Sequence, residues 1–477
     1  MAAGQGAEQG SRLGWTFIIT TIALFMTALD NLVVVTALPR IKVDLGASLS
    51  SLEWIVNAYT LTFAVLLLTG AALGDRYGRK IMFVGGLTLF TLASVLAALS
   101  HGADTLIVAR ALQGLGAAVV TPLTLTILAA EVPPEKRGAY LGAWGGVAGL
   151  AVAIGPVIGG ALVSGIAWQW IFWVNVPIGA IAVPLALLHL RETKGPYGKL
   201  DIEGLVLAVV GLFCIVFGVV RSNTLGWGSG EVLGLIVVGA VIVGVFCWWE
   251  TRSKTPMLPM RFFRIRAFSA ANGASFAMYF GMFGSIFLLT QYLQNVLGYS
   301  PIAAGVRLLA WTGVTMFVAP VAGIMSDRYG GRPFMATGLV LQAIALGWMA
   351  AIATPTLGYG SLVAPFVIAG IGMGLFFAPV ANVVLSAVRP EEEGEASGAN
   401  NALRELGGVF GIAVLAAIFA NRGGYGPPQH FIDGLKPAVW VGASIVAVGA
   451  VFSLFVPGVQ RAPATTTVAE PAQVADA

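Results

Sequence analysis

Ionisable residues interrupt several long apolar stretches of this chain, where a charge is costly. Three of them, Asp30, Arg110 and Glu405, are candidates for chemistry. A charged side chain at the centre of a membrane helix costs about 2.5–3.5 kcal/mol to insert. Such a residue is retained where it faces a cavity, a partner or a bound species, and burial enables a carboxyl group to hold and release a proton. We therefore interpret Asp30 as the principal acid for binding a proton or a cation within a membrane.

Each of these residues also has a simpler interpretation. Asp30 could be a solvated acid near an outer helix end, and Arg110 could extend to the outer membrane interface. Glu405 is either a second protonatable or cation-binding acid in a cavity or a residue without such a role. Its neighbour Arg404 cannot pair with it locally, because adjacent helical residues do not face each other. Glu53 lies near the end of its apolar stretch and is expected to be solvated.

Composition indicates which elements position these residues. The chain has 477 residues, of which 57% are hydrophobic and 10% are charged, whereas soluble domains contain about 25% charged residues. A membrane-spanning helix needs about 20 apolar residues. We therefore predict an all-α polytopic membrane protein with fourteen transmembrane helices. The predicted spans are 15–38, 52–73, 81–99, 104–130, 139–164, 169–190, 203–221, 232–250, 266–293, 303–325, 334–353, 360–387, 396–420 and 437–457.

The loops between these spans carry most of the 26 lysines and arginines. Loops rich in these residues alternate along the chain with loops that contain few of them. Cytoplasmic loops are enriched in these residues. Placing the N-terminus in the cytoplasm puts the basic loops there, so both termini are predicted to be cytoplasmic. The excess of arginine over lysine, with abundant alanine, glycine and valine, indicates a bacterial source. We therefore expect a multi-pass protein of the bacterial cytoplasmic (inner) membrane.

Two short motifs recur in the same order along the chain. Asp-Arg-Tyr-Gly-Arg-Lys at 75–80 returns as Asp-Arg-Tyr-Gly-Gly-Arg at 327–332, and Gly-Leu-Gly at 114–116 returns as Gly-Ile-Gly at 370–372. The spacing between the copies is nearly constant. This pattern predicts two pseudo-symmetric six-helix bundles in parallel orientation, with two inserted helices between them.

The duplication divides the chain into four predicted segments. Phe366 stands where the first bundle has Arg110, so the first bundle is expected to handle protons. The segments are the N-terminal bundle 1–194, the two inserted helices and their connecting loop 195–265, the C-terminal bundle 266–460 and a disordered tail 461–477.

The repeated loop combines opposed charges with glycines. Ion pairs in such a loop can latch neighbouring helices and would break and form again as the bundles move. Ordinary positive charge on a cytoplasmic loop is the simpler alternative, although Asp75 and the glycine spacing go beyond it. The predicted latch residues are Asp75, Arg76, Gly78, Arg79, Asp327 and Arg328.

Four segments of the sequence resemble motifs of the major facilitator superfamily. The stretch 71–80 resembles its signature between helices 2 and 3, although Ala71 replaces the usual glycine, and 106–118 resembles its helix-4 motif. The stretch 142–160 is similar to the helix-5 motif of its antiporters. The stretch 29–39 resembles helix 1 of its fourteen-span drug:proton antiporters. The resemblance extends from about residue 13 to about residue 457.

This resemblance implies roles for several of the residues above. Asp30 would bind substrate or proton, and Arg110 would take part in proton coupling. Glycines allow another helix to approach closely and proline bends a helix, so the helix-5 motif could seal a proton leak without a charge. Its residues are Gly155, Pro156, Gly159 and Gly160. Residues expected to line the cavity, where aromatic rings could bind flat cations, are Asn57, Tyr59, Gln113, Tyr279 and Phe283.

These features predict a transporter and not an enzyme. The function expected is proton-coupled efflux of hydrophobic or cationic drugs or antibiotics by alternating access. No GxxxxGK[ST] phosphate loop occurs in the sequence, so the proton gradient is expected to drive transport without a cofactor or metal. The expected partners are small amphiphilic or cationic substrates, protons and the lipid bilayer; no nucleic acid is expected, and the protein should be a monomer.

Three alternatives remain from the sequence. The first is a dedicated exporter of one native metabolite, such as a self-made antibiotic or a lipid. The second is a nutrient-uptake symporter, which conflicts with the glycine–proline motif in 142–160. The third is a membrane sensor that does not transport, against which the long intramembrane motifs in both bundles argue.

Overall fold

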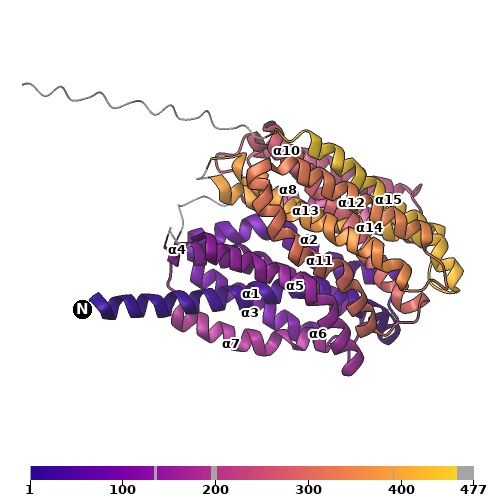
Figure 1. Ribbon diagram of the computed structural model, residues 1–477, viewed down its shortest axis with the longest axis horizontal. Coiled ribbons are helices and arrows are strands. Elements are labelled where there is room, and N and C mark those ends of the chain that lie inside the picture. The colour runs from indigo at the N-terminus through magenta and orange to yellow at the C-terminus, as the bar shows by residue number, and fades with distance from the viewer. Residues whose placement is uncertain (1, 134–136, 195–200, 390–391, 459–477) are drawn as a thin grey trace, which may run out of the picture.

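The structure is a computed structural model that describes residues 2–133, 137–194, 201–389 and 392–458, apart from some side chains within these ranges. All regular secondary structure in this part of the chain is helical, and it forms two lobes with an inserted helix pair (Figure 1). The first lobe contains α1 (Ala2–Leu45), α2 (Leu49–Tyr77), α3 (Arg79–Ala98), α4 (Ala103–Glu131), α5 (Arg137–Gly165), α6 (Trp170–Trp173) and α7 (Asn175–His189). The inserted pair is α8 (Ile202–Leu225) and α9 (Gly230–Glu250). The second lobe contains η2 (Met260–Arg264), α10 (Arg266–Gln291), η3 (Tyr292–Val296), α11 (Pro301–Tyr329), α12 (Gly331–Ile352), α13 (Gly360–Ser386), α14 (Glu393–Arg422) and α15 (Pro428–Leu454).

These helices agree closely with the predicted spans. Among the described residues, 13 helical segments are long and apolar enough to cross a membrane. Helix α5 is also 29 residues long, and its part Ile154–Gly165 forms a shorter apolar segment. The predicted span 169–190 is divided into α6 and α7. The predicted tail 461–477 and the start of the inserted segment at 195–200 lie outside the described residues.

The two lobes have equivalent helix contacts. In the first lobe α2 packs on α4 and α4 on α3, while in the second lobe α11 packs on α13 and α13 on α12. Two helix pairs make the largest contacts between the lobes, namely α5 with α11 and α2 with α14. These pairs are also equivalent under the duplication, because α2 corresponds to α11 and α5 to α14. The observed pairing supports the sequence repeat.

The repeated loop forms the same kind of turn in both lobes. One glycine separates α2 from α3 and another separates α11 from α12. Gly78 has φ 122° and Gly330 has φ 85°, a region that favours glycine because it lacks a Cβ. The helices that precede these turns also begin alike, since Ser48 caps α2 and Ser300 caps α11 through their side chains.

The inserted helices lie beside the joint between the lobes. Helices α8 and α9 pack on each other, and α8 also contacts α2 of the first lobe and α14 of the second. The rings of Trp54 in α2 and Phe213 in α8 have centroids 5.7 Å apart. Asp201 caps α8 at the Gly204 amide and also accepts a hydrogen bond of 2.8 Å from Trp249 Nε1 of α9. The pair is therefore fastened to both lobes through α8.

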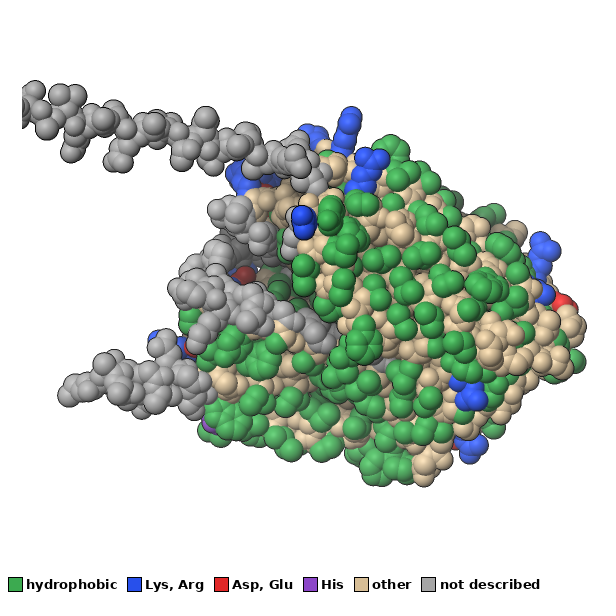
Figure 2. Space-filling view, viewed as in Figure 1, with side chains coloured by type: hydrophobic (Ala, Val, Ile, Leu, Met, Phe, Trp, Pro, Cys, Tyr) green, Lys and Arg blue, Asp and Glu red, His purple; other side chains and the backbone are tan. Residues whose placement is uncertain are grey.

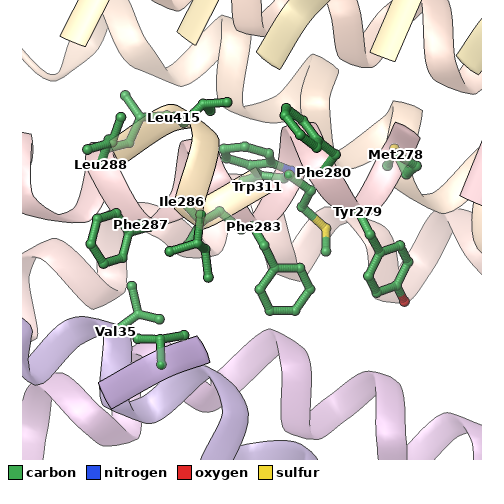
Figure 3. Packing of buried hydrophobic residues seen from close by; sticks show 14 of the residues in the cluster. Val35, Met278, Tyr279, Phe280, Phe283, Ile286, Phe287, Leu288, Trp311 and Leu415 are labelled. Atoms are coloured by element: carbon green, nitrogen blue, oxygen red, sulfur yellow. The ribbon is translucent and has the colours of Figure 1, made fainter. Parts of the chain in front are cut away.

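A hollow separates the lobes at one end of the molecule. Figure 2 shows this hollow on the side from which α1 begins. Away from the hollow, one apolar core includes residues of both lobes, such as Val35 of α1 and Phe287 of α10. Figure 3 shows these two side chains near each other, with the rings of Tyr279 and Phe283 pointing from α10 towards the first lobe. The fold thus places α10 and α14 opposite α1 and α2.

Candidate functional site

Asp30 and Arg110 form a buried ion pair between α1 and α4. Asp30 is 1% exposed and Arg110 is 0% exposed. Arg110 Nη1 donates to Asp30 Oδ2. A guanidinium group removed from water requires such a partner, because an uncompensated buried charge is strongly destabilising. The structure therefore brings together two residues that the sequence assigned to proton coupling.

Two amide side chains complete the environment of Asp30. Gln113 Nε2 and Asn175 Nδ2 donate to Asp30 Oδ1 over 3.3 Å and 3.0 Å. The same two amides also donate to Ser94 Oγ, over 2.8 Å and 3.4 Å. Asn175 is absent from the predicted site residues, although an amide within an apolar stretch is a signal that could have found it. Asp30 is therefore held from α1 by donors on α4 and α7.

The guanidinium group of Arg110 is fixed on its other sides by α2 and α4. Its Nε donates to the Ile55 carbonyl oxygen over 3.1 Å, and its Nη1 donates to Gln113 Oε1 over 2.9 Å. Its Cζ lies 4.2 Å from the ring centroid of Tyr59. The alternatives of a solvated Asp30 and of an Arg110 that extends to the interface are both wrong, because these partners enclose the pair.

Two residues predicted to line a cavity belong to this enclosed network instead. Gln113 is 0% exposed and bonded to Asp30, while Tyr59 is 1% exposed and donates to the Thr27 carbonyl oxygen over 3.0 Å. Asn57 is also 0% exposed, and neither its Oδ1 nor its Nδ2 has a hydrogen-bond partner among the described residues. Asn57 is thus an enclosed amide with unused hydrogen-bonding capacity.

A second cluster, on α10, α13 and α14, contains the other predicted cavity residues. The Tyr279 ring lies 5.6 Å from the Phe283 ring and 5.6 Å from the Phe377 ring of α13. Arg404 Cζ of α14 lies 4.7 Å from the ring centroid of Tyr279. Glu405 of α14 is 6% exposed, and α14 packs on α2 of the first lobe. The acidic residue Asp30 and the aromatic rings of α10 therefore belong to different clusters.

The glycine–proline motif of α5 lies at the contact between the lobes. A Cβ atom on Gly160 would lie 2.4 Å from the Pro301 carbonyl oxygen of α11. In the reverse direction, a Cβ atom on Gly305 of α11 would lie 2.1 Å from the Pro156 carbonyl oxygen. Both distances are too short for any side chain. The four motif residues, all buried, are Gly155, Pro156, Gly159 and Gly160.

Polar contacts also join the lobes near the C-terminal end of α1. Lys42 Nζ lies 3.0 Å from the ring centroid of Tyr425, whose hydroxyl donates to Gln291 of α10. Burial lowers the pKa of Lys42. Burial, and then the nearby charge of Glu53, raise the pKa of Tyr425 well above its usual value. The expectation of a solvated Glu53 is wrong, since its side chain is 0% exposed, close to the loop that carries Tyr425.

The predicted latch residues of the first lobe contact one another. Arg79 Nε donates to Asp75 Oδ1 over 2.8 Å, across the turn at Gly78. The guanidinium of Arg76 lies 5.3 Å from the ring centroid of the adjacent Tyr77. These described interactions lie within the first lobe.

A carboxylate not identified from the sequence fastens this loop. Glu192, which follows α7, accepts hydrogen bonds from the Lys80 and Ile81 amides at the start of α3, over 3.0 Å and 3.1 Å. A carboxylate at a helix N-terminus is favoured by the helix dipole. In the second lobe, Arg328 is exposed, and the side chain of Asp327 lies outside the described residues.

The described part of the chain offers no arrangement suited to a metal ion. Within it, no three His, Cys, Asp or Glu side chains gather closely enough to hold one. The carboxylate of Asp30 already accepts from three nitrogen donors, of which one is charged. The geometry suits a carboxylate that exchanges a charged partner for a proton.

Comparison with known proteins gives a consistent family assignment. The sequence profile of the Major Facilitator Superfamily matches residues 20–260 and 271–476. The tetracenomycin C resistance and export protein of Streptomyces glaucescens is 34% identical over 89% of this chain and 79% of its own length. The cephamycin export protein CmcT of Amycolatopsis lactamdurans is 34% identical over 90% of this chain and 91% of its own length. The multidrug transporter protein MdtP of Bacillus subtilis is 32% identical over 88% and 78%.

A solved structure supports the fold independently. It shows a POT family transporter in complex with a thioalcohol-conjugated peptide and superposes with a TM-score of 0.69, covering 93% of this chain and 96% of that chain. Its sequence is 15% identical. At this identity the likeness concerns the helix arrangement alone.

Proposed function

The chain belongs to the major facilitator superfamily, and we propose that it exports hydrophobic or cationic drugs or antibiotics in exchange for protons. It is a multi-pass membrane transporter and not an enzyme. We place the protein in the bacterial cytoplasmic membrane as a monomer, with both termini in the cytoplasm and small amphiphilic molecules as substrates. Its proposed units are the segments 1–194, 195–265, 266–460 and 461–477.

The observation that carries proton coupling is the enclosed pair of Asp30 and Arg110. While Arg110 contacts Asp30, the charged carboxylate is stabilised. A movement of α4 relative to α1 that separates the two groups would favour the protonated acid. Proton uptake and helix movement are then two aspects of one step. One proton crossing a potential of 100 mV releases about 2.3 kcal/mol, which can drive the cycle.

The hollow and the closed end support alternating access. The hollow lies on the side from which α1 begins, which the loop charges predict to be cytoplasmic (Figure 2). At the other end, α5 packs on α11 and Lys42 contacts Tyr425. We propose that this conformation accepts substrate from the cytoplasm, and that the closed end opens when Asp30 is protonated.

The second lobe supplies the surface that substrate would meet. Tyr279 and Phe283 are 5% and 6% exposed in this conformation and would meet substrate, together with Arg404, as the lobes separate. Glu405 is a second acid on α14, which packs on α2. A cationic substrate could reach Glu405 more directly than Asp30, because reaching Asp30 requires displacing Arg110. Loop residues Asp75, Arg79 and Arg328 would act as a latch during the movement.

Vesicle transport tests the proposal. The full chain would be reconstituted into liposomes loaded with a panel of dyes and antibiotics, and release would be followed with and without an imposed pH gradient. We expect at least one compound to be released faster with the gradient, and we expect the Asp30→Asn variant to lose this dependence. Release that ignores the gradient, or an unaffected Asp30→Asn variant, would overturn proton coupling.

A second candidate is a dedicated exporter of one native metabolite. Two of the relatives above are named for export of a single compound, tetracenomycin C or cephamycin. The same panel separates the candidates, because a dedicated exporter would release one compound, whereas a multidrug exporter would release several unrelated ones.

A further inference from the structure

The second lobe presents a positive charge whose role the proton-coupling pair does not explain. Arg404 lies in the middle part of α14, inside the membrane-spanning segment Glu395–Arg422. It makes no ion pair with any described residue, in contrast to Arg110, which pairs with Asp30. Its Nε is enclosed without a hydrogen-bond acceptor in the described part of the chain. A guanidinium group in an apolar setting is costly unless an anion compensates it.

Packing holds Arg404 in this place. A Cβ atom on Gly407 would lie 2.4 Å from the Phe276 carbonyl oxygen, and one on Gly411 would lie 2.1 Å from the Phe280 carbonyl oxygen, so α14 and α10 touch through their backbones. One turn before Arg404, Asn400 Nδ2 donates to Asn272 Oδ1 over 3.0 Å. The close crossing of α14 and α10 fixes Arg404 above the ring of Tyr279.

Flat apolar surfaces surround this cation. The rings of Phe283 and Phe377 each lie 5.6 Å from the ring of Tyr279, and the Tyr279 and Phe283 rings point towards the first lobe (Figure 3). Tyr279 and Phe283 are 5% and 6% exposed in this conformation, so a planar molecule would stack on their rings once the lobes separate, with a group at its edge reaching Arg404. Arginine suits an acidic group because its planar fork donates two parallel hydrogen bonds to a carboxylate.

The acid adjacent to Arg404 in the sequence is Glu405, which is 6% exposed. Neighbouring helical residues point in different directions. Helix α14 packs on α2 of the first lobe as well as on α10. Asp30, the other acid nearby in the first lobe, is neutralised by Arg110. Arg404 is therefore the cation that lies over the Tyr279 ring, while Asp30 is already paired with Arg110.

We propose that Arg404 recognises an anionic group, so that the preferred substrates are planar aromatic compounds with an acidic substituent. This inference rests on the export function proposed above and replaces the cationic substrates proposed there with acidic ones.

A matched pair of ligands tests the inference by binding, without requiring transport. The probes are anthraquinone-2-carboxylate and anthraquinone-2-carboxamide, which share one ring system and differ in charge, with ethidium as a cationic probe. Affinities for the purified full chain would be measured by calorimetry at neutral pH. We expect the acid to bind at least about tenfold more tightly than the amide, because hydrogen bonds to charged groups are worth about 1.5 kcal/mol or more.

Three variants identify the group responsible. Arg404→Gln should reduce the preference for the acid to about one, whereas Arg404→Lys should keep part of it because a point charge lacks the fork. Arg307→Gln is the matched control, since Arg307 also lies above a tyrosine ring, at 3.7 Å from the centroid of Tyr299, but near the start of α11. It should keep the full preference. Thermal unfolding would confirm that each variant is folded.

The outcomes separate this inference from the proposed function. Equal binding of acid and amide by the unmodified chain, an unchanged preference in Arg404→Gln, or tightest binding of ethidium would each overturn the role of Arg404. Proton-driven release of other compounds in the vesicle experiment would then leave the export function standing. Tight binding of the acid without any gradient-dependent release would instead overturn the export function and retain the binding site.

Discussion

Arg110 and Phe366 occupy equivalent places in the two lobes, and each lies against an aromatic ring of the neighbouring helix. Arg110 Cζ is 4.2 Å from the ring centroid of Tyr59. The Phe366 ring is 6.0 Å from the ring of Trp311. The two lobes therefore share one helix crossing, but only the first fills it with a charge. Asp30 provides the acid that this charge requires, which explains why a single lobe carries the proposed proton site.

The energetics of this pair can be tested by a double-mutant cycle. Removing one partner leaves a buried charge, so Asp30→Leu or Arg110→Met alone should lower the free energy of unfolding by about 3–5 kcal/mol. The double variant should lose much less than the sum of the two single variants. Chemical unfolding in detergent measures all three. Strictly additive losses would contradict a direct interaction. Proton-driven efflux should be absent even in the stable double variant.

Asn175 should tune the pH at which the transporter works. Asn175→Leu keeps the side-chain size but removes the donor that reaches Asp30 over 3.0 Å. Loss of a hydrogen-bond donor favours the protonated form of a carboxylate, so the pH of half-maximal efflux should rise. Efflux rates between pH 5 and 9 provide the measurement. Asn295→Leu, at an exposed site, is the control. An unshifted profile for Asn175→Leu would show that this hydrogen bond does not matter for coupling.

The α5–α11 contact should depend on the absence of a single methyl group. In Gly305→Ala the new Cβ would meet the Pro156 carbonyl oxygen at 2.1 Å, so the two helices must separate. We expect the closed end to open more often, with labelling of a cysteine introduced at the buried Val163 becoming several-fold faster. Gly313→Ala in the same helix is the matched control, because the nearest atom is 3.8 Å away. Equal labelling rates in the two variants would show that the contact does not keep this end closed.

Glu192 should contribute measurably to stability through the start of α3. The Glu192→Ala variant leaves the Lys80 and Ile81 amides without their acceptor, and loss of a cap typically costs about 1 kcal/mol. Glu192→Gln retains an acceptor and should lose less. Thermal unfolding of the purified protein measures both. A Glu192→Ala variant as stable as the unmodified chain would argue that water replaces the carboxylate at no cost.

Sequence patterns predicted the elements of this protein well, because the membrane imposes a simple rule on them. A helix must be long and apolar enough to cross the bilayer. The predicted span 104–130 is α4, Ala103–Glu131, and the predicted span 360–387 is α13, Gly360–Ser386. The repeated Asp-Arg-Tyr-Gly motif also predicted that the lobes share a turn, which Gly78 and Gly330 confirm.

Burial near helix ends could not be predicted in the same way. Glu53 is close to the start of α2, and position alone suggested contact with water. In the folded chain Glu53 is 0% exposed. Its burial depends on how α14 packs on α2, and the sequence around Glu53 contains no information about that contact.

The sequence by itself determined the membrane-spanning helices, the duplication and the ionisable residues that deserve a functional role. Only the tertiary structure decided which of these residues meet. Asp30 and Asn175 are 145 positions apart in the chain, yet they are joined by a hydrogen bond. Arg404 lies on Tyr279 of another helix, not beside its neighbour Glu405. Hydropathy determines which segments cross the bilayer. The partner of a buried charge depends instead on how each helix is rotated and where it crosses its neighbours. Close backbone contacts at glycines determine that geometry.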